Sequence, residues 1–246
     1  MKFSVLLVLT ALAAGAQSQS LFGGLDVINP IGQWIPTTGS YSNGQYKQAI
    51  YLSFDGMHQF DLVRYIATHP SSTWAKIVQN AVVYSNARAS SPSDSLPGTT
   101  ALFSGTSPRN SGIFWETVYD RSLYPPGSNC VGPVGTIADY SEAIDLDNTM
   151  LDGGGGFNLS LLPQELTSWG TCAYVYPHNF IRTNTIFEVG RGNGLVTAYA
   201  DKHLSYEFLN GPSGVGLSEG YFPEVASVAG TLEAQEGWDD LHCKLS

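Results

Sequence analysis

The chain has 246 residues, of which 43% are hydrophobic and 13% charged, and its formal net charge is -10 at neutral pH. This length allows one large domain with a substantial core. The acidic balance, with no cluster of Lys or Arg, excludes a nucleic-acid backbone as the main partner, because binding to that backbone depends on counterion release. An anionic substrate would need local help from a metal or a helix N-terminus.

The first sixteen residues have the pattern of a secretory signal peptide. Lys2 provides the positive n-region, residues 3–12 provide the apolar h-region, and the small residues from Ala14 to Ala16 fit a cleavage site. This apolar run is shorter than the roughly 20 residues that a membrane-spanning helix needs. We therefore expect a secreted, extracellular protein without a membrane span, whose net charge changes from -10 to -11 when Lys2 is removed.

A strand that ends in a carboxylate is expected after an irregular lead-in over residues 17–47. The run AIYLSF (49–54) is short and apolar, which is typical of a buried strand, and Asp55 and Gly56 follow it. In open α/β sheets ligands bind outside the carboxyl ends of the strands, and Gly56 would let the backbone turn tightly there. Asp55 is therefore a candidate ligand residue, although a role in a turn or as a helix cap fits equally well.

Two helices and a second strand are expected next. The spacing of apolar residues predicts a helix over 58–69. A second helix is expected over 71–81, with Ser71 or Ser72 as its cap, and a second strand over 82–89.

The stretch SPSDSLPG (91–98) predicts a helix that begins at Ser95. Pro97 fits the first turn of a helix, where its missing N–H is not needed. Ser95 would then lie at or near the N-cap, beside backbone N–H groups and the positive end of the helix dipole. Its hydroxyl can be a cap and nothing more, or a nucleophile if a metal lowers its pKa. The two roles are compatible.

The stretch 122–163 is rich in turns and predicts a covering insertion. It contains Asn158, which begins an N-glycosylation sequon expected in a surface loop. Secretion permits disulfides. Among the three cysteines we favour a bridge between Cys130 and Cys172, because both lie in turn-rich segments, and this leaves Cys243 unpaired.

The second half of the chain predicts a further helix over 184–189, followed by glycines, and a strand over 195–200. The order of strands and helices along the chain favours an α/β domain with a mainly parallel sheet.

Polar residues near these elements are further candidates. Asp201, Lys202 and His203 follow the expected strand, and Lys202 could meet an anion. His178 could also contact a ligand, but a lone His is more often structural. For all four residues a structural role remains the alternative.

Two motif-like stretches are interpreted as chance matches. GLSEG (216–220) fits the G-x-S-x-G pattern of serine hydrolases, but the segment before it does not predict the strand that a nucleophile elbow needs. GRGNG (190–194) lacks the third glycine of a dinucleotide-binding fingerprint and follows a helix instead of a strand.

Three segments together resemble the type I phosphodiesterase/nucleotide pyrophosphatase family of the alkaline-phosphatase superfamily, and most closely its secreted microbial branch. They are YLSFDGMHQFDL, SPSDSLPGTTALFSGTSPRNSGIFWETVYDRSL and VYPHNFIRTNTIFEVGRGNGLVTAYADKHLSYEFLNGPSG. The resemblance covers roughly residues 48–225. It implies an alkaline-phosphatase-like, mostly parallel sheet flanked by helices.

The resemblance also implies an activity. Such enzymes hydrolyse phosphodiesters or pyrophosphates, here a nucleotide-like small molecule, with two divalent metals, usually zinc. Ser95 matches the nucleophile, which is Thr or Ser in the family and forms a covalent intermediate, and both Asp55 and Ser95 match metal ligands. We expect these two residues to lie close together. The related sulfatases have an Arg at the position of Thr99, so sulfate-ester hydrolysis is disfavoured.

The remaining metal ligands of the family are expected in a second half that includes an Asp-His-Gly segment, which this sequence lacks. A trio of Asp239, Asp240 and His242 lies near the end, where frayed surface residues are common. We therefore expect residues 48–246 to be the N-terminal part of such a domain, with an incomplete sheet and zinc ligand set. The alternative function is an inactive remnant, or the product of a misread gene end, that binds at most a ligand or partner. Such a remnant would bind no metal.

Overall fold

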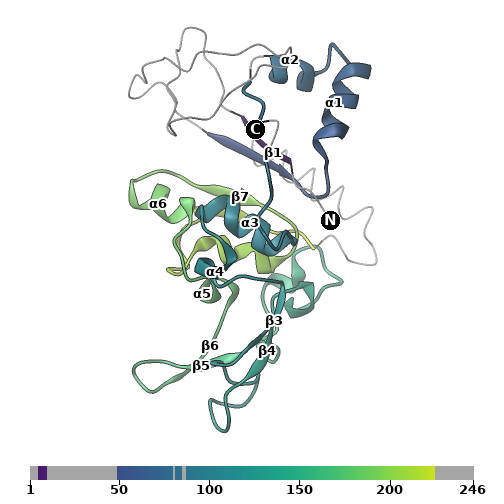
Figure 1. Cartoon of the computed structure of the whole chain (residues 1–246). Helices are drawn as coiled ribbons and strands as arrows, with labels where there is room; N and C mark the ends of the chain where they lie inside the picture. The colour runs from purple at the N-terminus through teal and green to yellow at the C-terminus, as the bar shows by residue number, and fades with distance from the viewer. Residues whose placement is uncertain (1–4, 10–48, 80, 85–86, 225–246) are drawn as a thin grey trace. The chain divides into compact units, whose positions relative to one another are not determined.

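The computed structural model describes residues 5–9, 49–79, 81–84 and 87–224, which belong to two compact units (Figure 1). The first unit ends at Ala89 and the second begins at Ser90. The described elements of the first unit are β1 (Val5–Leu9), β2 (Ile50–Phe54), α1 (Gln59–Thr68) and α2 (Thr73–Gln79).

The strand expected over 49–54 is present as β2, but its surroundings differ from the prediction. It pairs antiparallel with β1, which lies in the segment expected to be the signal peptide. Ile50 is 67% exposed and Leu52 is 37% exposed, because a two-stranded ribbon cannot cover both of its faces. The predicted buried position in a parallel sheet is therefore wrong for this strand.

The two helices of the first unit are confirmed, with slightly shorter bounds than predicted. The N-terminus of α1 is fixed by His58, whose backbone N–H donates to Asp61 Oδ2 at 2.8 Å. At α2, Ser72 is the cap, since its Oγ accepts a hydrogen bond from the backbone N–H of Ala75 at 3.1 Å. The strand predicted over 82–89 is wrong: in its described part only Val83 forms an isolated bridge.

The second unit contains more elements. Its helices and strands are α3 (Ser95–Ser104), α4 (Pro108–Ser111), β3 (Thr117–Asp120), β4 (Thr136–Asp139), β5 (Gln164–Leu166), β6 (Cys172–Tyr174), α5 (Pro177–Phe180), α6 (Ile186–Gly192), β7 (Ala198–Ala200) and β8 (Glu219–Tyr221). Three 3₁₀ helices lie between them: η1 (Glu142–Ile144), η2 (Gly153–Gly155) and η3 (Leu204–Asn210).

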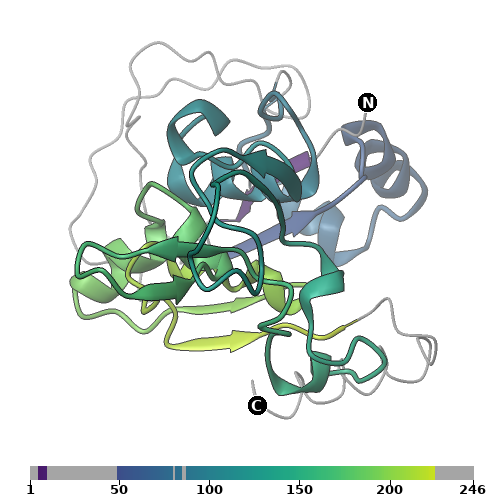
Figure 2. The ribbon, with the colours of Figure 1, turned by 90° about the horizontal axis from the view of Figure 1, so that it is seen from below.

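The described strands form small two-stranded sheets, most of them antiparallel. In the second unit β3 pairs with β4 and β5 with β6, both antiparallel, and β7 pairs with β8 in parallel (Figure 2, light green and yellow). The fold is mixed α/β, and the described residues contain no extended parallel sheet, so this part of the prediction is wrong. Strands that follow each other closely in the sequence, such as β3 and β4, pair antiparallel once the chain reverses its direction. Parallel strands need a long crossover connection. Between β7 and β8 this connection contains η3.

The core of the second unit forms around α3 and η3. Phe103 of α3 is 7% exposed, and its ring centroid lies 5.1 Å from that of Phe187 and 5.4 Å from that of Tyr199. Tyr206 and Phe208 of η3 are almost fully buried beside each other, with ring centroids 5.8 Å apart. The contacts of Phe103 join α3, α6 and β7, and both α3 and α6 also pack against η3.

Cys130 and Cys172 form a disulfide in the structure, with their Cα atoms 5.6 Å apart. The bond ties the turn-rich insertion to the first residue of β6. Cys243 lies outside the described residues.

Candidate functional site

Ser95 is the first residue of α3, one position after the N-cap. Asp94 has extended backbone angles, and its carbonyl accepts the hydrogen bond of Gly98 N–H at 2.9 Å. Ser95 is half-buried, while the next two residues, Leu96 and Pro97, are buried. The serine is therefore held at the N-terminal end of a ten-residue helix, where the helix dipole favours negative charge.

The rest of α3 fixes this end in the unit. Thr100 is fully buried, and its Oγ1 donates to the carbonyl of Leu96 at 2.8 Å. The helix ends at Gly105, whose φ of 67° is the left-handed conformation that glycine adopts at low cost. Since α3 also packs against α4, α6 and η3, the position of Ser95 is determined by the core.

Asp55 directly follows β2 and is exposed in a turn with Gly56. It belongs to the first unit and Ser95 to the second. The expectation that the two residues share a metal therefore stays a prediction.

The described residues do not complete a zinc site. No group of three or more His, Cys, Asp or Glu side chains in the described part of the chain could hold a metal ion. A zinc ion takes four ligands, and Asp55 and Ser95 would supply at most two. The trio Asp239, Asp240 and His242 lies outside the described residues.

Residues 49–134 match the model of the type I phosphodiesterase / nucleotide pyrophosphatase family. The match includes both Asp55 and Ser95, and it ends before Asp201. No curated protein and no solved structure matches the chain. The phosphodiesterase resemblance thus rests on the segment that carries the two predicted catalytic residues.

Asp201 and Lys202 lie outside the segment that matches the phosphodiesterase family. Asp201 follows β7 as predicted, and its carboxylate accepts hydrogen bonds from the hydroxyl of Tyr199 and, at 2.8 Å, from the backbone N–H of Lys202. Burial raises the pKa of the Asp201 carboxyl, although these hydrogen bonds oppose the shift. Lys202 Nζ lies 5.9 Å from the centre of the Tyr206 ring. Both residues are thus integrated in the protein's own contacts.

His203 has a buried carboxylate partner that the sequence did not indicate. Its Nδ1 lies 2.9 Å from Oε2 of Glu224, which is fully buried. The backbone of His203 has a φ of 57°, which is uncommon for a residue with a side chain. The pair connects the start of η3 to the segment after β8.

His178 has a similar partner in Glu207. The Glu207 carboxylate lies 2.8 Å from His178 Nδ1 and also accepts the backbone N–H of His178 at 3.0 Å. The two residues join α5 to η3. Because 29 positions separate them in the chain, no local sequence signal could have indicated the pair.

The remaining sequence predictions concern loops and strand ends. Ser218 of GLSEG accepts hydrogen bonds from Arg191 Nη1 at 2.7 Å and from the backbone N–H of Thr197 at 3.0 Å, just before β8. It thus lies outside a strand-to-helix elbow.

Asn158 is half-buried in a loop, where its Oδ1 accepts a hydrogen bond from the hydroxyl of Ser160 at 2.6 Å. Its glycosylation stays a prediction. Within the described residues, no helix is long and apolar enough to span a membrane.

Proposed function

We propose that the chain is a secreted, metal-dependent hydrolase of the phosphodiesterase/nucleotide pyrophosphatase type, with Ser95 as its nucleophile and Asp55 as a metal ligand. The observation that carries the proposal is the family match over residues 49–134, which includes both residues. The position of Ser95 at the start of α3 supports it.

The chemistry proposed for Ser95 is a two-step displacement. Its Oγ attacks phosphorus, a new oxygen–phosphorus bond forms, and the bond to the leaving oxygen breaks, while the hydroxyl proton passes to the leaving group or to water. Water then hydrolyses the phosphoserine ester and releases the second product. The N-terminal end of α3 favours the negative phosphoryl group at this position. The substrate would be a phosphodiester or a nucleotide-like small molecule.

The test is the hydrolysis of a chromogenic phosphodiester by the purified chain with added zinc. We expect Ser95→Ala and Asp55→Asn to reduce turnover to background, which is a loss on the order of a thousandfold or more for a covalent nucleophile. Ser95→Thr should retain activity, because the resemblance implies that either hydroxyl serves. Ser93→Ala and Asp61→Asn are matched controls on the same segments and should leave turnover unchanged.

Zinc content separates this proposal from the alternative of an inactive remnant. About two zinc ions per chain, with turnover that disappears in Ser95→Ala, would support the hydrolase. Turnover that persists in Ser95→Ala would contradict the assigned nucleophile. A chain that binds no zinc and shows no turnover would support the remnant.

A further inference from the structure

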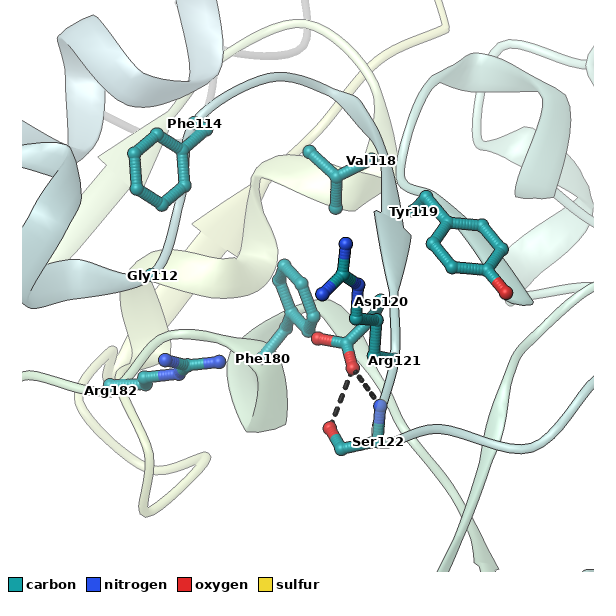
Figure 3. A pocket seen from close by; sticks show the side chains of 9 residues that line it. All are labelled: Gly112, Phe114, Val118, Tyr119, Asp120, Arg121, Ser122, Phe180 and Arg182. Atoms are coloured by element: carbon teal, nitrogen blue, oxygen red, sulfur yellow. Dashed lines mark hydrogen bonds between the residues drawn. The ribbon is translucent and has the colours of Figure 1, made fainter. Parts of the chain in front are cut away.

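The second unit contains a cavity of about 340 Å³ that includes neither Ser95 nor any other predicted site residue (Figure 3). It lies between the end of α4, the end of β3 and the end of α5. Its volume is within the range of roughly 300–1,000 Å³ that is usual for small-molecule sites. A molecule of one aromatic ring with a charged substituent would fit a space of this size.

Two arginines supply the positive charge of this cavity. Figure 3 shows the guanidinium groups of Arg121 and Arg182 on either side of the Phe180 ring, and both residues line the pocket. Within the described part of the chain neither guanidinium forms a hydrogen bond or an ion pair, and both side chains are exposed. Their donors are therefore available to a ligand, and guanidinium groups suit phosphate and carboxylate oxygens.

The backbone fixes the position of Arg182. Its N–H donates to the carbonyl of Ser111 at 2.9 Å, at the end of α4. Its side chain passes directly over Gly112, where a Cβ atom would lie 2.9 Å from Arg182 Nε. Gly112 also has a φ of 82°, which glycine adopts without strain. The backbone conformation therefore favours glycine here, and the absence of a side chain leaves space for that of Arg182.

Asp120 adds a negative charge to the same lining. Its Oδ1 accepts hydrogen bonds from the backbone N–H of Ser122 at 2.7 Å and from the Ser122 hydroxyl at 2.6 Å. Figure 3 shows the other carboxylate oxygen on the side of the Phe180 ring, away from Ser122. Two arginines and one aspartate leave the lining with a net positive charge in a chain whose net charge is -10. This balance favours a ligand of low negative charge over a polyanion.

We propose that this pocket binds a small aromatic anion, which is a molecule with one flat ring and one phosphate, phosphonate or carboxylate group. The anionic group would lie between Arg121 and Arg182. The ring would contact Phe180, which is 8% exposed, and Phe114, which is 44% exposed. The negative charge of Asp120 would disfavour a second negative charge on the ligand. This site does not depend on the function proposed for Ser95.

The experiment is a calorimetric titration of the full chain with phenylphosphonate, whose carbon–phosphorus bond is not a substrate for phosphoester hydrolysis. We expect saturable binding at a single site, and at least tenfold weaker binding of the neutral benzyl alcohol. Arg121→Gln and Arg182→Gln should each weaken binding by about tenfold, since each removes charged hydrogen bonds to the ligand. Asp120→Asn keeps the acceptor for Ser122 but removes the negative charge, so it should tighten binding several-fold.

The matched control is Arg109→Gln. Arg109 is an exposed arginine on α4 that is not part of the pocket lining, so the substitution makes the same charge change nearby and should leave affinity unchanged. The proposal is overturned if phenylphosphonate does not bind, if Arg109→Gln weakens binding as much as the pocket variants, or if Asp120→Asn weakens it. Because the measurement is binding and not turnover, a failure of the proposed hydrolysis would leave its result intact.

Discussion

The carboxyl of Asp201 shows how the position of a single residue can couple stability to pH. Burial at the end of β7 raises its pKa, although Tyr199 and Lys202 donate hydrogen bonds to it. The folded protein therefore binds this proton more tightly than the unfolded chain does. The resulting stabilisation is complete below the ordinary Asp pKa of about 4 and is lost as the pH rises through the raised pKa.

We expect Asp201→Asn to become more stable relative to the wild type as the pH rises from about 4 to 7, because Asn retains an acceptor oxygen and never acquires the buried charge. The measurement is the difference in melting temperature between variant and wild type across this range. Asp147→Asn is a control of opposite sign. Hydrogen bonds from Thr149 lower the pKa of Asp147, so its variant should lose relative stability as the pH rises through the lowered pKa to about 4, and the difference should change little from there to 7. A flat difference for Asp201→Asn would contradict the assignment.

For single residues, the sequence predicted the place in a helix or strand better than the interaction partners of the side chain. Ser95 lies at a helix N-terminus and Asp201 lies at a strand end, as the local patterns indicated. The carboxylates that hold His178 and His203 were not predicted, because Glu207 and Glu224 are 29 and 21 residues away. Only the tertiary fold brings these groups together.

At the scale of elements, Phe103 anchors α3 in the core through two aromatic contacts. Phe103 packs against Phe187 of α6 and Tyr199 of β7 and is 7% exposed. We expect Phe103→Ala to lower the free energy of unfolding of this unit by about 3 kcal/mol or more, since it removes buried surface and leaves a cavity. Urea denaturation measures the change. Trp169→Ala is the matched control, because Trp169 is 90% exposed and its loss should change stability by about 0.5 kcal/mol or less.

Helices and strands were predicted more accurately where the pattern of apolar residues extended over a longer segment of the sequence. The helix predicted over 58–69 is present as α1 (Gln59–Thr68), because its apolar spacing extends over several turns. The strand predicted over 195–200 shortens to β7 (Ala198–Ala200), and the strand predicted over 82–89 is not formed in its described residues. Short apolar runs become strands only where a partner strand is present, which no local pattern encodes.

At the scale of the whole molecule, the predicted class of fold is right and the predicted topology is wrong. The order of strands and helices along the chain favoured a parallel sheet, yet the described strands form separate pairs, and among them only β7 and β8 are parallel. Segments close in sequence, such as β5 and β6, reach each other at a lower cost in loop-closure entropy than distant strands do. Pairing of distant strands depends on contacts that a single sequence does not display.

A covalent connection within the second unit is the disulfide between Cys130 and Cys172, which are 42 positions apart. Closing a loop of this length restricts the unfolded chain, so the loss of the bond should lower the free energy of unfolding by about 2–4 kcal/mol. We expect the double variant Cys130→Ser and Cys172→Ser to show this loss in urea denaturation under non-reducing conditions, and the wild type to show it only after reduction.

Thiol titration tests the same disulfide, because it counts the cysteines that remain as free thiols. The chain has three cysteines, so the unfolded, unreduced protein should have one reactive thiol, which we assign to Cys243. The variant Cys243→Ser should then have none, while its stability should respond to reduction as that of the wild type does. Three reactive thiols in the wild type would show that the bridge is absent. Reactive thiol in Cys243→Ser would show that the pairing is different, since a bond between Cys130 and Cys172 leaves no other cysteine in that variant.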